Sequence, residues 1–444
     1  MMRRDRQQNN ELHLKVFADR SELVRPDGAT EIFNEGPMSE QAKERYRRIT
    51  DALANGFLES QIARCRDNPE SLTFDSMREE HKALIDRLTG SMTGEVGRAL
   101  IGLTVLQLCI KSIEPDQNIR LHKGGSVRTA FSWNDGISMR SLDNQYITPT
   151  LRNYDLLKLN KDGFMMTRTL AENYPYSKVY KANIRGARDE WATIVEGIEA
   201  REIEPDSSLH YLLSKLLNSA NDFKILADET LKLMDVALNE NKICSPTDAL
   251  GLLERHINES NHAARIMEIA MHSLMQAEQE AGALGAASLI PLSQMRSANK
   301  KHGNIGDIEL MEDGSIIEAW DAKFGKTYLR DELEEINDKI ESHTDVRLVG
   351  FVTSERPERL EELEARRADI EQTHDVSLKI LTLREWVDEQ ISRTAETGVE
   401  ESDLARMWMT AYVESLAQRR PEIAPIDEPC YQWLQTLNAI LKNV

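Results

Sequence analysis

Cysteine is scarce in this chain of 444 residues, and its four cysteines lie far apart, at Cys65, Cys109, Cys244 and Cys430. No Cys-x-x-Cys pair occurs. Because structural zinc sites and disulfide frameworks need cysteines at short, regular spacing, we expect neither. The sequence predicts free, buried thiols instead.

Long hydrophobic runs are also lacking. Hydrophobic residues make up 40% of the chain and charged residues 29%, which is typical of a soluble globular protein. No apolar stretch predicts a membrane-spanning helix, and no apolar segment follows the charged N-terminus, as it would in a signal peptide. We therefore expect a cytoplasmic protein without a membrane partner, built from two or three domains.

Several motifs that mark catalysis are absent. The chain has neither a GxxxxGKS or GxxxxGKT loop nor a GxGxxG, so we expect no nucleoside triphosphate as a partner. No serine or cysteine nucleophile stands in a recognisable motif. His256, His262 and His272 lie in helical context without metal-ligand spacing, and we expect them to pack or to face solvent.

Negative charge dominates the chain but not all of it. The net charge of −20 argues against nonspecific binding of a polyanion over the whole surface. Between Arg120 and Arg188, however, twelve basic residues stand against five acids, so this segment carries +7 and the rest of the chain −27. The asymmetry predicts where an anionic partner docks.

This basic segment is predicted to bind double-stranded DNA. TPTLRNYDLL predicts a short helix beginning at Thr148, and LKLNKDGFMMTR predicts a hairpin around Asp162-Gly163, an arrangement that resembles a winged helix. Arginine and amide side chains read base edges, whereas lysines mainly contact phosphates. The predicted contacts, including two lysines before the acidic strand, are Arg128, Arg140, Arg152, Asn153, Lys158, Lys161, Arg168, Lys300 and Lys301. The alternatives are a polar region with scattered arginines and, around Lys300 and Lys301, a solvated loop.

The rest of the chain divides into helical and mixed segments. The first forty residues are predicted to be irregular, and SEQAKERYRRITDALANGF predicts a helix that starts at its serine. TGEVGRALIGLTVLQLCIKSI is apolar almost all round, which predicts a buried helix. Residues 261–391 read as helix, strand, strand, helix, strand, helix, strand, which predicts an α/β core with a mixed sheet.

The predicted fold class is therefore α+β or α/β, with a mostly helical N-terminal half followed by a mixed-sheet core flanked by helices. The predicted regions are a helical N-terminal region (1–115), a winged-helix-like region (116–192), a helical connector (193–258), the core (259–395) and C-terminal helices (396–444).

The stretch GDIELMEDGSIIEAWDAKFGK carries the clearest chemical signal. Side chains alternate across a strand, so Asp307 and Glu309 share one face of a first strand, and Asp321 and Lys323 share one face of a second. A hairpin would bring Asp307 near Asp321. Two such carboxylates repel unless a cation lies between them, and a few hard oxygen ligands suit Mg²⁺. A neighbouring lysine can orient or deprotonate water and offset the charge of a phosphate.

This pattern resembles the PD-(D/E)XK nuclease superfamily over residues 261–391. The resemblance implies a restriction-endonuclease-like core with Mg²⁺ as cofactor. It implies that Asp307, Asp321 and the carbonyl of Ala322 bind the metal and that Lys323 is the catalytic lysine. Such sites often add a glutamate from the first core helix, for which Glu280 and Glu278 are the candidates. Gly306 stands where the motif of the superfamily has proline.

Two functions from different classes are compatible with these patterns. The first is a Mg²⁺-dependent, sequence-specific endonuclease of restriction type II, which would cut both strands of DNA as a homodimer. The second is a non-catalytic DNA-binding regulator with a C-terminal α/β domain for dimerisation or sensing. A nuclease subunit of a larger defence complex is a third possibility.

The acids of the strands are also compatible with a solvated sheet face. However, Ile317 and Ala319 precede Asp321 on its face of the strand. This neighbourhood favours an acid at the edge of a core.

Overall fold

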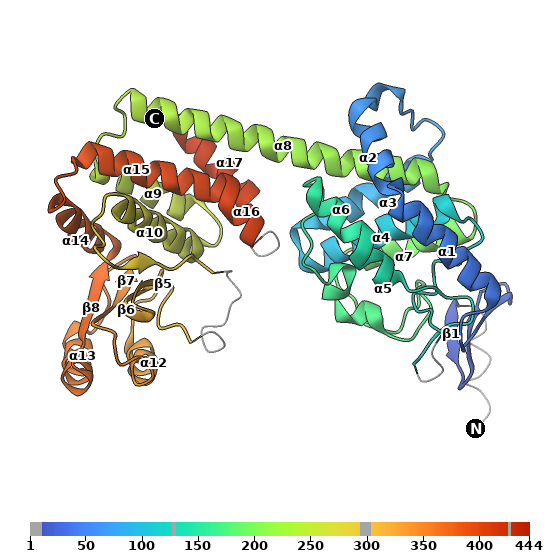
Figure 1. The fold of residues 1–444 in the computed structure, drawn as a ribbon, viewed down its shortest axis with the longest axis horizontal. Helices are drawn as coiled ribbons and strands as arrows, with labels where there is room; N and C mark the ends of the chain where they lie inside the picture. The colour runs from blue at the N-terminus through green and yellow to red at the C-terminus, as the bar shows by residue number, and fades with distance from the viewer. Residues whose placement is uncertain (1–10, 127–129, 294–302, 425–427) are drawn as a thin grey trace. The chain divides into compact units, whose positions relative to one another are not determined.

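The chain folds into two units, residues 1–222 and 223–444, and each has its own hydrophobic core (Figure 1). The computed structural model describes residues 11–126, 130–293, 303–424 and 428–444. The boundary between the units falls within the long helix α8 (Pro205–Asn239), inside the segment predicted as a helical connector. A mixed α+β fold, the class predicted from the sequence, is confirmed.

Unit 1 begins with a three-stranded antiparallel sheet, so the prediction of irregular structure in the first forty residues was wrong. The strands are β1 (His13–Val16), β2 (Arg20–Val24) and β3 (Thr30–Asn34). Each buries only one or two side chains, among them Leu23 and Phe33, which belong to a small core with Trp133. Strands of this length are too short to display a clear period of two among polar residues.

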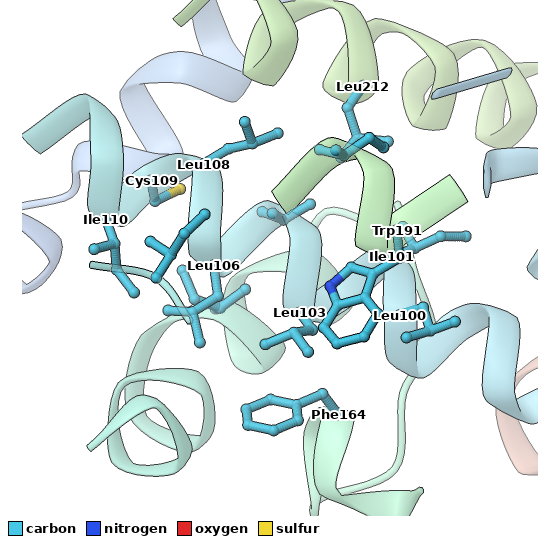
Figure 2. Packing of buried hydrophobic residues seen from close by; sticks show 14 of the residues in the cluster. Leu100, Ile101, Leu103, Leu106, Leu108, Cys109, Ile110, Phe164, Trp191 and Leu212 are labelled. Atoms are coloured by element: carbon cyan, nitrogen blue, oxygen red, sulfur yellow. The ribbon is translucent and has the colours of Figure 1, made fainter. Parts of the chain in front are cut away.

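The larger helices of unit 1 gather around α4 and bury its apolar surface. α1 begins as predicted, because the Ser39 hydroxyl accepts the backbone N–H of Ala42 at 3.1 Å. Figure 2 shows leucines of α4 beside Phe164 and Trp191. The helices are α1 (Glu40–Ala54), α2 (Phe57–Asp67), α3 (Glu79–Gly90), α4 (Glu95–Ile113) and α7 (Arg188–Glu199).

By length and composition α4 could cross a membrane, contrary to the prediction that no stretch is apolar enough to do so. In this fold 78% of the most apolar stretch of α4 is buried inside the protein, as is usual for a core helix. The cysteines are free, as predicted, but only three of them are buried; Cys244 is exposed.

The described residues of the basic segment do not form the predicted winged helix. α5 (Met139–Leu142), a π-helical turn (Asp143–Ile147) and α6 (Thr148–Asn153) form one continuous helical run. Two 3₁₀ turns, Gly163–Met166 and Arg168–Ala171, replace the predicted hairpin. The apolar residues of this stretch, including Phe164, are buried in the core around α4, so the segment packs as a layer and does not project as a wing.

Unit 2 is built on a five-stranded mixed sheet in the order β4-β5-β6-β7-β8. Its strands are β4 (Ser288–Leu289), β5 (Ile308–Glu312), β6 (Ser315–Lys323), β7 (Leu348–Thr353) and β8 (Ser377–Thr382). β4, β5 and β6 pair antiparallel, whereas β6, β7 and β8 pair in parallel. Apart from the added two-residue strand β4, the predicted order of helices and strands is confirmed.

Helices cover both faces of this sheet (Figure 1). α10 (Ala263–Glu280) and α14 (Leu383–Ala395) share a core with Trp320 and Val352. α12 (Arg330–Ile340) and α13 (Leu360–His374) share the core of the other face with Ala319 and Phe351. The other described helices of unit 2 are α9 (Pro246–Glu259), α15 (Glu401–Glu414), α16 (Arg420–Ile423) and α17 (Cys430–Leu441). Of these, α9, α15 and α17 share the core of α10.

Candidate active site

Asp307 and Asp321 stand opposite each other on neighbouring strands. Ile308 of β5 pairs with Trp320 of β6, so the next residues outward, Asp307 and Asp321, face each other across the antiparallel pair. The backbone N–H of Asp307 donates to the carbonyl of Trp320 at 2.9 Å, which extends this register beyond β5. Because opposed residues project to the same face of a sheet, the structure brings the two predicted acids together.

Gly306 allows this close approach of the two strands. A Cβ atom at this position would lie 2.7 Å from the carbonyl oxygen of Trp320. That distance is shorter than any ordinary contact, so a larger residue would push the strand start away. Glycine at this position therefore has a local structural reason.

The carboxyl group of Asp307 lies in a buried and negatively charged environment. Its Oδ2 accepts the backbone N–H of Ala322 at 3.1 Å. Burial raises the pKa of Asp307 well above its usual range, and the charges of Asp321 and Glu268 raise it further. The carboxyl groups of Asp307 and Asp321 are close enough to share a hydrogen bond. These surroundings thus favour the protonated form of Asp307 when no cation is bound.

Lys323 lies beside the two acids, as predicted. Its Nζ is 2.7 Å from Oδ2 of Asp321, and its ammonium stands over the ring of Phe351. Burial alone would lower the pKa of Lys323, but the charges of Asp321 and Asp307 outweigh burial and raise it. The side chain therefore keeps its proton and acts as a cation. Among the roles predicted for it, this favours charge stabilisation over deprotonation of water.

Glu268, and not Glu280 or Glu278, is the glutamate of α10 that lies near the acids. Its charge acts on Asp307 and it is itself influenced by Asp321. Glu280 is exposed at the end of α10, about 18 Å further along the helix axis. Glu278 is fully buried and bound to Arg393 at 2.6 Å, so it has a structural role. The predicted assignment of Glu280 to the site is corrected accordingly.

The sequence did hold a signal for Glu268. Its neighbours Met267 and Ile269 are both buried, so this carboxylate interrupts an apolar run, whereas Glu280 lies at a polar helix end. Burial raises the pKa of Glu268, although the charge of Arg265 opposes the shift. An acid placed among core residues needs a compensating partner.

Glu268 is anchored by an ion pair that belongs to a larger charged network. Arg265 forms ion pairs with Glu268 and with Glu428, the latter at 2.9 Å. Glu428 also accepts a hydrogen bond from Nε of Arg420 at 2.6 Å. Glu428, which lies just before α17, is thereby linked to the helix that carries Glu268.

Glu309 has a structural role in positioning Asp307. Its Oε1 accepts the backbone N–H of Ile305 at 2.6 Å and that of Gly306 at 3.2 Å. These bonds fix the turn that leads into Asp307. Glu309 is buried and its carboxylate is already occupied, so it is not available as a ligand.

The donor groups at this site suit a hard cation. Two carboxylates converge, and Ala322 directs its N–H toward Asp307, so its carbonyl points to the same edge of β6. In the described part of the chain, no three His, Cys, Asp or Glu side chains gather closely enough to hold a metal ion together. A cation here would rely on two carboxylates, a carbonyl, water and phosphate, which is the type of coordination that Mg²⁺ accepts.

Comparisons with known proteins assign the chain to no family. No family model matches the chain. No curated protein sequence matches it either. The resemblance to the PD-(D/E)XK superfamily stays a prediction from the sequence.

The residues predicted to contact DNA lie mainly in unit 1. Arg140, Arg152, Asn153, Lys161 and Arg168 are all exposed. Lys158 is half-buried and pairs with Asp155 at 3.5 Å. Arg128, Lys300 and Lys301 lie outside the described residues.

The exposed cations of this segment stay unpaired, unlike most others in the protein. Within the described residues, no ion pair or side-chain hydrogen bond engages Arg140, Arg152, Lys161 or Arg168. Arg120, by contrast, is fully buried and pairs with Glu196 at 2.8 Å. Arg120 thus stabilises the fold, while the unpaired cations remain available to an anion.

Proposed function

We propose that the protein is a Mg²⁺-dependent, sequence-specific endonuclease of restriction type II that hydrolyses phosphodiester bonds in double-stranded DNA. The observation that carries this proposal is the convergence of Asp307 and Asp321 on one face of the sheet, with Lys323 beside them. The core built on αβββαβ order, within which these residues lie, supports the resemblance to PD-(D/E)XK nucleases.

Each side chain has a chemical role in this proposal. Asp307, Asp321 and the carbonyl of Ala322 would hold Mg²⁺, which supplies an activated water and neutralises phosphate charge when bound. Lys323, kept as an ammonium, stabilises negative charge that builds on the scissile phosphate. Glu268 adds a carboxylate near the pair and is positioned by Arg265.

The substrate and assembly follow from the charge and from the reaction. Unpaired cations on an acidic protein suit the phosphates of DNA. Cutting both strands of a short site needs two catalytic centres, so we propose a homodimer. A restriction function also implies that the protein works in the cytoplasm, where it meets DNA.

A non-catalytic DNA-binding regulator is the second candidate. It is favoured by one observation, the absence of a cluster of three metal-binding side chains among the described residues. Incubation of the purified protein with plasmid or phage DNA, in Mg²⁺ and in EDTA, separates the two. Discrete fragments that require Mg²⁺ support the nuclease, whereas a gel shift without cutting in either buffer supports the regulator.

Substitution of Lys323 tests the proposed chemistry. We expect Lys323→Ala to slow cutting by about a hundred- to a thousandfold and to leave DNA binding intact, because the lost cation stabilises only the reacting phosphate. The matched control is Lys379→Ala, which removes another strand lysine paired with a carboxylate, Glu389, at 2.6 Å. Equal activity of Lys323→Ala and the parent would contradict the assigned role.

A further inference from the structure

We propose that the helical run from Met139 to Asn153 reads base edges in the major groove of DNA, with Asn144 and Gln145 as specificity-determining residues. The inference rests on the proposed function, since it names the element that would select the DNA sequence cut by unit 2. Neither Asn144 nor Gln145 is among the DNA contacts predicted from the sequence.

The run is long enough to follow a groove. α5, the π-helical turn and α6 are continuous over fifteen residues, and span about 22 Å at the rise of an α-helix. The major groove of B-form DNA admits an α-helix. π-Helical turns inside helices occur often at functional sites, because they change which residues face outward.

The two sides of this run differ sharply in chemistry. Its inward side chains, Met139, Leu142, Ile147 and Leu151, are fully buried in the core of unit 1. The exposed positions carry only cations and amides: Arg140, Asn144, Gln145, Arg152 and Asn153. The one acid of the run is Asp143, and it is fully buried.

This outward surface complements DNA in charge and in hydrogen bonding. Arg140 and Arg152 form no ion pair with described residues, although the chain carries a net charge of −20. Arginine recognises guanine, and asparagine or glutamine recognises adenine through two hydrogen bonds. Asn144 and Gln145 stand in the π-helical turn between the arginines, where they are neutral and can discriminate without adding charge.

Asp143 fixes the orientation of the run. Its carboxylate accepts the Thr148 hydroxyl at 2.9 Å and the backbone N–H of Phe164 at 2.9 Å. Gly163 has a φ of +56°, and a Cβ there would lie 1.9 Å from the carboxylate of Asp143. The turn that carries Lys161 is therefore packed directly against the turn that presents Asn144 and Gln145. A rigid presentation of this kind is what base reading requires.

Sequence selection from a random pool tests the inference without requiring cleavage. The full chain in EDTA is equilibrated with duplexes that contain a randomised segment, and the bound fraction is sequenced. The double variant Asn144→Ala/Gln145→Ala is compared with the parent and with Asn218→Ala, a control for loss of an exposed helical amide. We expect the double variant to lose preference at one or two base pairs, by roughly ten- to a hundredfold each. Nonspecific affinity and salt dependence should be unchanged, because no charge is removed.

The outcomes separate this inference from the proposed activity. An identical motif for the double variant and the parent would overturn the reading role, and so would a parent that enriches no motif. We also expect the double variant to have the same melting temperature as the parent. This result would show that the altered preference is not caused by unfolding. Suppose that plasmid DNA stays uncut in Mg²⁺ while the double variant still loses its preference at one or two base pairs. In that case the nuclease proposal fails, but the role of the helical run in sequence recognition stands.

Discussion

Asp307 illustrates how its surroundings determine the charge of a single side chain. Burial and two neighbouring carboxylates favour its neutral form, so its pKa is raised. A group with a raised pKa stabilises the fold at low pH and loses that contribution as pH rises through the raised value. The ionised pair of carboxylates is therefore repulsive. If the pair binds Mg²⁺ as proposed, binding of the metal and loss of the proton form a single coupled event.

This coupling predicts the pH dependence of metal binding. Mg²⁺ affinity should rise with pH until Asp307 is ionised, and binding should release about one proton below that point. Calorimetric titrations in two buffers of different ionisation enthalpy measure the proton count. Asp307→Asn should abolish the release and melt at a higher temperature in EDTA, while Asp345→Asn, an exposed control, should behave as the parent. Equal proton release by Asp307→Asn would contradict the coupling.

His122 gives a prediction for the stability of unit 1. Burial lowers its pKa to about 3. Below the ordinary pKa of histidine, His122 therefore takes up a proton in the unfolded chain but not in the folded chain. As the pH is lowered, the free energy of unfolding decreases by up to about 1.4 kcal/mol per pH unit. His122→Phe, which keeps the stacking on Tyr176, should flatten this acid limb in urea unfolding between pH 6 and 4. An unchanged slope would show that His122 is not its cause.

At the scale of elements, the site depends on a register and on a helix position. The β5–β6 pairing sets Asp307 opposite Asp321, and Glu309 holds the turn before it. α10 places Glu268 near the end of these strands, where it pairs with Arg265, which also pairs with Glu428. The C-terminal helices are thus linked to the site through Glu428.

Glu428→Gln tests this link. Removal of the shared negative charge leaves Arg265 and Arg420 buried without full compensation, which should destabilise unit 2 by about 3–5 kcal/mol. Glu414→Gln is the matched control, because its partner Arg419 is about half exposed and 3.7 Å away, and it should cost less than about 1 kcal/mol. Urea unfolding followed by tryptophan fluorescence measures both. Equal effects of the two substitutions would rule out the network as a structural link.

The long, strongly patterned elements could be predicted from the sequence, whereas their contacts could not. α4, α10 and the order of strands in unit 2 follow from periodicity and turn residues. The winged helix was wrong because the apolar residues near Phe164 pack in the core of unit 1, a tertiary effect that no local pattern displays. Glu268 was missed because the helical turn that meets the strand ends depends on how α10 lies on the sheet. Asp307, Asp321 and Lys323 were found because period-two spacing alone places them.

At the scale of the whole molecule, the two units divide the charge and the chemistry. Unit 1 holds the described unpaired cations that were predicted to contact DNA, and unit 2 holds the acids and Lys323. At the edge strand β8, the backbone N–H of Leu378 donates to Glu371, and its carbonyl accepts a hydrogen bond from Arg367.

The unpaired cations predict how binding responds to salt. Lys161→Ala and Arg168→Ala should each weaken DNA binding about equally for all sequences and reduce the salt slope by about one. Fluorescence anisotropy at several salt concentrations gives the slopes. Lys232→Ala on α8, an exposed lysine outside this segment, serves as the control. Unchanged slopes for Lys161→Ala and Arg168→Ala would remove this surface from the interface.

The central claim is that Asp307 and Asp321 share one divalent cation next to Lys323. Anomalous diffraction from crystals soaked in Mn²⁺, used in place of Mg²⁺, tests it most directly. We predict one strong peak at bonding distance from both carboxylates, with the Lys323 amine turned away from Asp321. A metal bound only elsewhere, or Asp321 still paired with Lys323 in saturating Mn²⁺, would contradict the claim.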